Sequence, residues 1–485
     1  MIEIAFVGQS YNMDSLDISS QRSVNMYPEV YKDGNAKTVM SLRTTHGLLE
    51  FATQTGVNQN RGMHLTATNR LFSVQGNDVA EFSTAGTETA RFTLDSGVSP
   101  ADNAIVKMCD NGVNVLFTDG TAGYVYNLST DTATKISTQV SGDGDAFPDS
   151  ATHCAILDGF YIVNVPSTTL CYYSSVDNPL VWSTLSSLSK EGSSDFVNSL
   201  IVSNRRLWVF GSQSYEVFYN TGDSNNQFLR MEGTYHNIGC QAPYSVAENG
   251  VSVFWLGSNA QGFGQIFRSN GFDPMPISTR PIETAIHGYS TTSDAEGFCF
   301  QQEGNEFYQL TFPTEGVTWV YDLGTGMWHE KTYFNQTTGN EERHRGRTQV
   351  FFNGKNYMGD WNNGKIYEVS TTTYTDDGAP IIRTRISPVV WNALERVYYD
   401  SIEFDIESGT GLVTGQGKTP QIMVSWSNDS GHTYGTEVWV GAGKIGEYRK
   451  RAKINRLGAA RNRVFKVQYS EPTPFNIFNL HAEFG

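Results

Sequence analysis

Asn111-Gly112-Val113-Asn114-Val115-Leu116-Phe117 is a turn followed directly by a run of β-branched and aromatic residues. An Asn-Gly pair supplies the positive φ angles of a tight hairpin turn, and the run behind it is typical of a β-strand. Asn-Gly pairs begin at residues 111, 249, 270, 353 and 363, and Asp-Gly pairs begin at residues 33, 119, 143, 158 and 377. Long runs of helical periodicity are lacking, so the sequence predicts an all-β protein.

The turn-and-strand arrangement recurs along most of the chain. Starting from residue 69, the copies follow one another at steps of 42, 47, 46, 45, 55 and 49 residues. A period of about 40–50 residues with about four short strands per unit is typical of propeller blades. We therefore predict a β-propeller of six or seven degenerate blades over residues 49–379, with two packed sandwiches as the alternative. The copies begin at residues 69, 111, 158, 204, 249, 304 and 353.

The pattern changes near residues 376–380, after which the strand-forming runs become longer. They cover Val397–Ile406, Gln421–Ser427, Thr436–Val440 and Val464–Tyr469. We predict an added C-terminal β-sheet or sandwich-like docking domain at residues 380–485. Residues 1–48 contain polar loops and are predicted to form an extended segment with the first strands, which reaches outside the propeller.

The charge of the chain is unevenly distributed. The chain has 34 Lys and Arg and 50 Asp and Glu residues. Residues 1–379 contain 21 Lys and Arg and 40 Asp and Glu, a net charge of −19. Residues 380–485 contain 13 Lys and Arg and 10 Asp and Glu, a net charge of +3. Gripping nucleic acid requires Lys and Arg against phosphate, so the acidic body argues against a DNA-wrapping protein. It remains compatible with a duplex that slides past a repulsive wall, and with plain solubility charge.

No motif indicates catalysis. The histidines have no metal-ligand spacing, and G-x-S-x-G and H-E-x-x-H motifs are absent, so we expect no enzyme activity, catalytic residue, metal or cofactor. Ser427–Tyr434 fits an Asp box, which is a structural turn. The five scattered cysteines predict reduced thiols of a protein folded in a cytosol. No apolar run reaches the roughly 18 residues of a membrane-spanning helix.

Two basic clusters are candidates for an interface or for contact with DNA. The first lies in a predicted loop and can bind phosphate or an acidic partner, or simply be solvated. The second lies in the C-terminal part and predicts a docking face, with a strand edge protected by charge as the alternative. The first cluster is Arg343, Arg345 and Arg347; the second is Arg449, Lys450, Arg451, Arg456, Arg461 and Arg463.

Short motifs at both ends of the chain carry a family resemblance. Arg-Ser-Val-Asn-Met-Tyr-Pro at residues 22–28 is followed by Leu-Arg-Thr-Thr-His-Gly-Leu at residues 42–48, and Ile-Asn-Arg-Leu-Gly at residues 454–458 precedes the closing strands. In this order they resemble the tail hub proteins of short-tailed bacteriophages (podoviruses), also called nozzle or packaged-DNA stabilisation proteins. Relatives usually have Pro where this chain has His46. The motif residues are Asn25, Tyr27, Pro28, Arg43 and Gly47.

The resemblance implies a structural role in the virion tail. Six copies would form a ring below the portal and its adaptor, continue the DNA exit channel, retain the packaged DNA and anchor tail fibres, spikes or a needle. It also implies assembly in the cytoplasm of the bacterial host and non-specific contact with double-stranded DNA. Because a cyclic ring needs two different complementary patches, the opposite charge biases could assist its assembly. The alternative is a glycan-binding or sialidase-like propeller protein.

Overall fold

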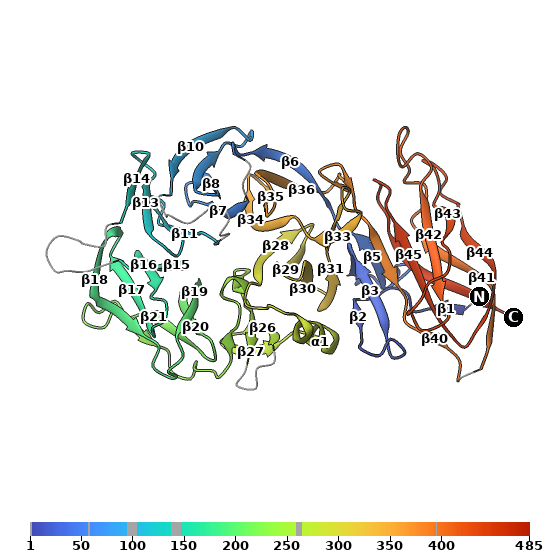
Figure 1. Ribbon diagram of the computed structural model, residues 1–485, viewed down its shortest axis with the longest axis horizontal. Coiled ribbons are helices and arrows are strands. Elements are labelled where there is room, and N and C mark those ends of the chain that lie inside the picture. Colours follow the sequence, from blue (N-terminus) through green and yellow to red (C-terminus); the bar gives the residue numbers. More distant parts are fainter. Residues whose placement is uncertain are drawn as a thin grey trace.

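The computed structural model describes residues 2–56, 59–94, 104–136, 147–148, 150–258, 264–393 and 395–485. Figure 1 shows a propeller on the left and a β-sandwich on the right, with both chain termini in the sandwich. Strands form nearly all of the regular structure in these residues. The helical elements there are α1 (Arg280–Gly288) and the short 3-10 helix η2 (Pro243–Ser245).

Seven blades form the propeller in the described part of the chain. Blades 1 to 5 are separate sheets, whereas blade 6 is part of an 11-stranded sheet and blade 7 of a six-stranded one. The bounds of blades 1 to 3 are β7 (Asn60–Leu65), β8 (Leu71–Gln75), β9 (Asp78–Phe82) and β10 (Glu88–Thr93); β11 (Lys107–Asp110), β12 (Asn114–Thr118), β13 (Gly123–Asn127) and β14 (Thr132–Lys135); and β15 (Cys154–Leu157), β16 (Phe160–Asn164), β17 (Leu170–Ser175) and β18 (Asn178–Ser189).

Blades 4 to 7 continue the ring. Their bounds are β19 (Val197–Ser203), β20 (Arg206–Gly211), β21 (Tyr215–Asn220) and β22 (Phe228–Arg230); β23 (Gly239–Cys240), β24 (Ala247–Glu248), β25 (Val253–Ser258), β26 (Gly264–Asn270) and β27 (Asp273–Pro276); β28 (Glu296–Gln302), β29 (Asn305–Phe312), β30 (Val317–Asp322) and β31 (Met327–Glu330); and β34 (Gly346–Phe352), β35 (Lys355–Asp360), β36 (Lys365–Ser370) and β6 (Gly47–Thr53).

The ring closes through a strand from near the N-terminus. β6 pairs antiparallel with β36, with Leu48 opposite Val369, so the last blade combines segments more than 300 residues apart. The apolar cluster between blades 7 and 1 contains Ala52, Leu71 and Ile366. Removing such side chains from water stabilises the closed ring by about 25 cal/mol per Å² of apolar surface.

Aromatic residues fill the spaces between blades. Trp208 and Phe210 of blade 4 and Trp255 of blade 5 belong to one buried cluster, and the ring centroids of Phe210 and Trp255 are 5.3 Å apart. A four-stranded blade has two apolar faces and cannot cover them itself, so neighbouring blades must stack. The predicted all-β class, with a propeller followed by a sandwich, is confirmed, and the sequence copies correspond to the seven second strands from β8 to β35.

The sandwich contains strands from both ends of the chain. One sheet has the order β4-β5-β46-β41-β44, with β1 also on β46, and the other contains β3-β39-β45-β42-β43, with β2 on β3 and β40 on β45. The bounds are β1 (Ile2–Ile4), β2 (Tyr11–Asn12), β3 (Ser20–Val24), β4 (Met26–Val30), β5 (Met40–Thr44), β39 (Arg383–Ile386), β40 (Val390–Trp391), β41 (Val397–Ile406), β42 (Gln421–Ser427), β43 (Val438–Gly441), β44 (Ala452–Ala460), β45 (Asn462–Tyr469) and β46 (Ile477–Phe484).

The N-terminal strands therefore complete the C-terminal sandwich. Ile4, Phe6 and Leu42 are buried in the same cluster as Phe404 and Phe465. The second sandwich sheet is also continuous with blade 6, because β3 pairs with β31 at Val24 and Glu330. Shared strands, rather than a flexible linker alone, join the two parts of the molecule (Figure 1).

Two short hairpins lie beside this junction. Their bounds are β32 (Thr332–Asn335) with β33 (Asn340–Arg343), and β37 (Thr375–Asp376) with β38 (Ala379–Pro380). The basic stretch that was predicted to be a loop is thus largely strand, because residues 340–343 belong to β33 and residues 346–352 to β34. That prediction was wrong.

Candidate functional site

Asn25 links the two parts of the molecule at the junction. Its backbone has φ = 54°, and Asn tolerates this left-handed conformation better than most residues. Its side-chain amide donates to the Ile382 carbonyl oxygen at 2.9 Å and to Thr332 Oγ1 at 3.0 Å, and its Oδ1 accepts from the Thr332 N–H at 2.9 Å. Because its side chain is buried, these three bonds fix the course of the chain between β3 and β4.

The other family-motif residues lie around the same junction. Tyr27 is buried and packs edge-on against Phe307 at 5.4 Å between ring centroids. Arg43 Nη1 lies 3.1 Å from Glu29 Oε2. Pro28 stands opposite Leu42 in the β4–β5 hairpin.

Gly47 begins β6 where no side chain fits. A Cβ atom at Gly47 would lie 2.3 Å from the Thr375 carbonyl oxygen and 2.7 Å from that of Thr373. The glycine is therefore required for the close approach of β6 to the chain after blade 7. Asn25, Tyr27 and Gly47 thus make contacts at the junction, whereas Pro28 and Arg43 lie in the adjoining β4–β5 hairpin.

Two fully buried arginines at the junction, Arg383 and Arg385, were not identified as important by the sequence analysis. Arg385 donates to the carbonyl oxygens of Phe6, Gln9 and Arg22 at 2.6, 3.0 and 3.3 Å. Arg385 also donates to Ser23 Oγ and Gln21 Oε1. Arg383 donates to the backbone carbonyl oxygens of Tyr374, Ile381 and Glu471. Burial lowers the pKa of Arg385 to about 9, which leaves it charged at neutral pH. Nothing in the local pattern Arg-Thr-Arg distinguishes them from surface arginines.

The first basic cluster faces partners within the chain. Arg345 Nε lies 2.8 Å from Asp360 Oδ2, and Arg347 binds the Glu296 carboxylate with two nitrogens, the closer at 2.7 Å. Arg343 stacks over the Trp361 ring at 4.0 Å. The charges of Arg345 and Arg347 are therefore balanced inside the subunit, and both side chains are largely buried.

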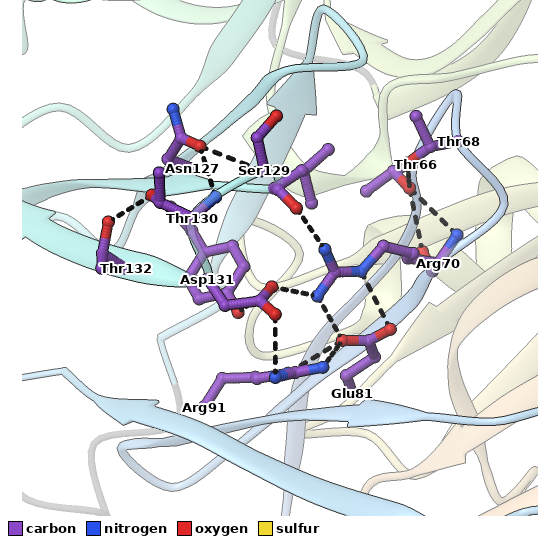
Figure 2. Close-up of polar contacts among 12 residues, drawn as sticks. Thr66, Thr68, Arg70, Glu81, Arg91, Asn127, Ser129, Thr130, Asp131 and Thr132 are labelled. Carbon is purple, nitrogen blue, oxygen red and sulfur yellow. Dashed lines mark hydrogen bonds and ion pairs between the residues drawn. The ribbon is translucent and has the colours of Figure 1, made fainter.

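A further set of arginines joins blades 1 and 2 (Figure 2). Arg70 donates to both oxygens of Glu81 at 2.9 and 2.6 Å and to Asp131 Oδ1 at 2.7 Å, and Arg91 pairs with Glu81 from the next strand. Arg70 also donates to the Leu128 carbonyl oxygen across the blades. Two positive and two negative charges cancel here, so the network is an interblade contact with no surplus charge.

The second basic cluster lies in and on both sides of β44, which is the edge strand of its sheet. Arg449, Lys450, Arg456 and Arg461 are exposed, and in the part of the chain that the structure describes their side chains make no hydrogen bond or ion pair. Arg451 differs, because its guanidinium pairs with Glu403 on the neighbouring strand β41. An edge strand with unbalanced positive charge can attract an acidic partner and at the same time resist unspecific strand pairing.

Arg463 does not belong to this surface. It is buried, donates to Asn428 Oδ1 at 2.8 and 2.9 Å, and lies 4.4 Å from the Tyr399 ring centroid. Its role is in the packing of the sandwich.

Arg456 has an unusual backbone. Its φ is +63°, and the register of β44 against β41 shifts around it, from Gly458 opposite Tyr399 to Asn455 opposite Ser401. Such a bulge bends an edge strand and interrupts its pairing pattern. A left-handed conformation costs a residue other than Gly about 1–2 kcal/mol, so the conformation of Arg456 is imposed by the surrounding sheet.

Other candidate chemistry is structural. Asp429 of the Asp box accepts from Thr433 N and Thr433 Oγ1 at 2.9 and 2.6 Å, which closes a hairpin turn. The five cysteines are free. Among the described residues no group of three or more His, Cys, Asp or Glu side chains is placed to hold a metal, and no helix is long and apolar enough to cross a membrane.

Comparisons with known proteins identify both parts of the chain. Residues 2–374 match the family described as bacteriophage P22 Gp10, beta-propeller, and residues 382–485 match bacteriophage P22 Gp10, beta-sandwich. A search of the curated proteins finds no match.

Among solved structures, the chain is similar to a streptogramin B lyase, with 10% identity, 67% of this chain and 97% of that chain covered, and a TM-score of 0.45. It is also similar to virginiamycin B lyase from Staphylococcus aureus, with 10% identity, 66% and 98% coverage and a TM-score of 0.44. A third similar structure is the N-terminal domain of Nup159, with 10% identity, 72% and 99% coverage and a TM-score of 0.41.

Proposed function

Because the chain belongs to the family of the bacteriophage P22 Gp10 protein in both its propeller and its sandwich, we propose that it is the tail hub of a short-tailed phage, which continues the DNA exit channel below the portal and adaptor. Membership of this family makes it a structural protein of the virion tail. The match of both domains, in order and over nearly the whole chain, is the observation that carries the proposal.

In the proposed assembly, six copies form a ring through head-to-tail contacts. Such contacts join two different patches on each subunit. The exposed cations in and beside β44, which are Arg449, Lys450, Arg456 and Arg461, supply one patch, and the acidic propeller of the neighbouring copy supplies the other. The net charges of −19 over residues 1–379 and +3 over residues 380–485 favour this orientation.

The hub retains the packaged DNA and lets it pass at ejection. The acidic body repels phosphate and prevents a duplex from adhering to the channel wall, so contact with DNA is transient and non-specific. The hub binds the portal and adaptor proteins on one side and anchors fibres, spikes or a needle on the other. The protein folds in the host cytoplasm and joins the virion there.

The ring interface is tested by charge reversal. We expect Arg449→Glu, Arg456→Glu and Arg461→Glu together to abolish rings of the purified protein in electron micrographs and to lower the yield of infectious particles. Arg280→Glu is the control, because Arg280 is also exposed but lies at the start of α1 on the propeller. Rings that form equally well in the triple variant would refute the interface. Absence of the wild-type protein from the tail of purified particles would refute the hub itself.

A further inference from the structure

A small cavity lies where blades 6 and 7 meet the N-terminal strand β4. It has a volume of about 20 Å³, which is enough for one water-sized particle and too little for a phosphate or a sugar. Its polar lining consists of Tyr27, Thr45, His46, Gln302, His329 and Lys331, and none of its ten lining residues is acidic.

Lys331 brings a buried positive charge to this cavity. The residue is 5% exposed, and within the described residues its Nζ makes no hydrogen bond or ion pair, although this atom still touches solvent. Lys331 Nζ lies over the Phe300 ring, 5.7 Å from the ring centroid. Burial lowers the pKa of Lys331 to about 8, although the negative charge of Asp376 opposes this. Lys331 is therefore mostly protonated at neutral pH and lacks a counter-charge in contact.

The other polar groups of the cavity are suited to donate hydrogen bonds. Gln302 Oε1 already accepts from Asn356 Nδ2 at 2.7 Å, so its free end is the NH₂ group. Nδ1 of His329 and both ring nitrogens of His46 are buried without a hydrogen bond, and burial lowers the pKa of both imidazoles, that of His329 to about 3. Each ring is thus neutral at neutral pH and carries one N–H.

One carboxylate lies near the cavity without entering it. Glu303 Oε2 is 3.1 Å from His46 Nε2, without the geometry of a hydrogen bond, and Glu303 is not among the lining residues. A water molecule in the cavity would meet an ammonium group and several donors but would bring no charge to offset the ammonium. An anion accepts hydrogen bonds from the ammonium and N–H groups, and it also supplies the negative charge that offsets the ammonium.

We propose that this cavity is a binding site for a single monatomic anion of the halide class, held by Lys331 and by the donors of Gln302 and His329. The site joins β4, blade 6 and strand β36 of blade 7, so a bound anion stabilises the junction between the propeller and the N-terminal segment. The inference is independent of the proposed hub function, because it concerns the isolated chain.

Thermal unfolding of the full chain tests the site, with sodium chloride compared with sodium gluconate at equal ionic strength. We expect chloride to raise the unfolding midpoint of the wild type by roughly 1–3 °C over gluconate, because a ligand that binds only the folded state stabilises it. Lys331→Met should remove this difference. Lys444→Met, at an exposed lysine of the sandwich, should keep it.

A second measurement does not depend on how the variant folds. Wild-type crystals soaked in sodium bromide should show an anomalous peak in the cavity next to Lys331 Nζ. An empty or water-filled cavity at high bromide, or the same chloride effect in Lys331→Met as in the wild type, would overturn the proposal.

Discussion

Removing the charge of Asp376 should stabilise the protein at neutral pH. Asp376 is 3% exposed, its Oδ1 has no hydrogen-bond partner, and it forms no ion pair within the described residues. Burial raises its pKa from 3.8 to about 6, against the opposing influence of Lys331 and Arg383. The folded chain therefore holds a carboxylate that would be more stable in water.

The sign and size of the effect follow from this pKa. Below pH 3.8 Asp376 is protonated in both states; between pH 3.8 and about 6 the unfolded chain releases the proton while the folded chain keeps it. The free energy of unfolding falls as the pH rises through this window. The difference between the two pKa values corresponds to about 3 kcal/mol, which the wild type has lost by pH 7.

Asp376→Asn removes this dependence while keeping the shape of the side chain. We expect the variant to equal the wild type near pH 4 and to exceed it by about 3 kcal/mol at pH 7, measured as the free energy of unfolding in urea at several pH values and constant chloride. The next residue provides the control, because Asp377 is exposed and pairs with Lys365 at 2.6 Å. Asp377→Asn should cost no more than about 1 kcal/mol. A constant difference between Asp376→Asn and wild type from pH 4 to 7 would refute the reasoning.

Three other changes test the buried polar groups. Arg385→Met removes a donor from five acceptors and should lower the free energy of unfolding by about 3–5 kcal/mol, with lost hydrogen-exchange protection in the N-terminal segment; unchanged protection there would contradict this. Glu296→Gln should cost about 3–5 kcal/mol in urea unfolding, and adding Arg347→Met should recover part of the loss, whereas additive losses would argue against a buried pair. Asn25→Ala should destabilise by about 1 kcal/mol more than Asn25→Gly, because only Gly accepts φ = 54° without strain, and equal urea midpoints would contradict the role of this φ.

The blades could be predicted from the sequence because each carries a local signal. The positive φ angles that the Asn-Gly and Asp-Gly pairs supply are present at Gly112, Asp158, Gly250 and Asn353, each in the turn that precedes the second strand of its blade. Such turns need only neighbouring residues to form, so a single sequence contains their signature. The same holds for the long sandwich strands β41 and β42, whose bounds agree with the predicted ones.

The partners of the N-terminal strands could not be predicted in this way. β6 joins β36 and β3 joins both β31 and β39, at separations of about 300 residues or more. Pairing of this kind depends on which edges remain free after the rest of the chain has folded. The pattern of one strand does not encode its partner, although Gly47 and Asn25 mark the places where the backbone needs special residues.

The arginines show why the candidate site could be predicted only in part from the sequence. Arg347 and Arg456 both lie in dense basic stretches, yet Arg347 is buried against Glu296 while Arg456 is exposed on a bulged edge. The difference arises from a carboxylate about 50 residues away, which the local pattern cannot reveal. The number of Lys and Arg residues in a stretch of sequence therefore overestimates the positive charge that the folded protein exposes there. Once the paired arginines are set aside, the cations left without a partner along β44 are the ones that an acidic neighbour can neutralise, and they are where a ring contact should be tested first.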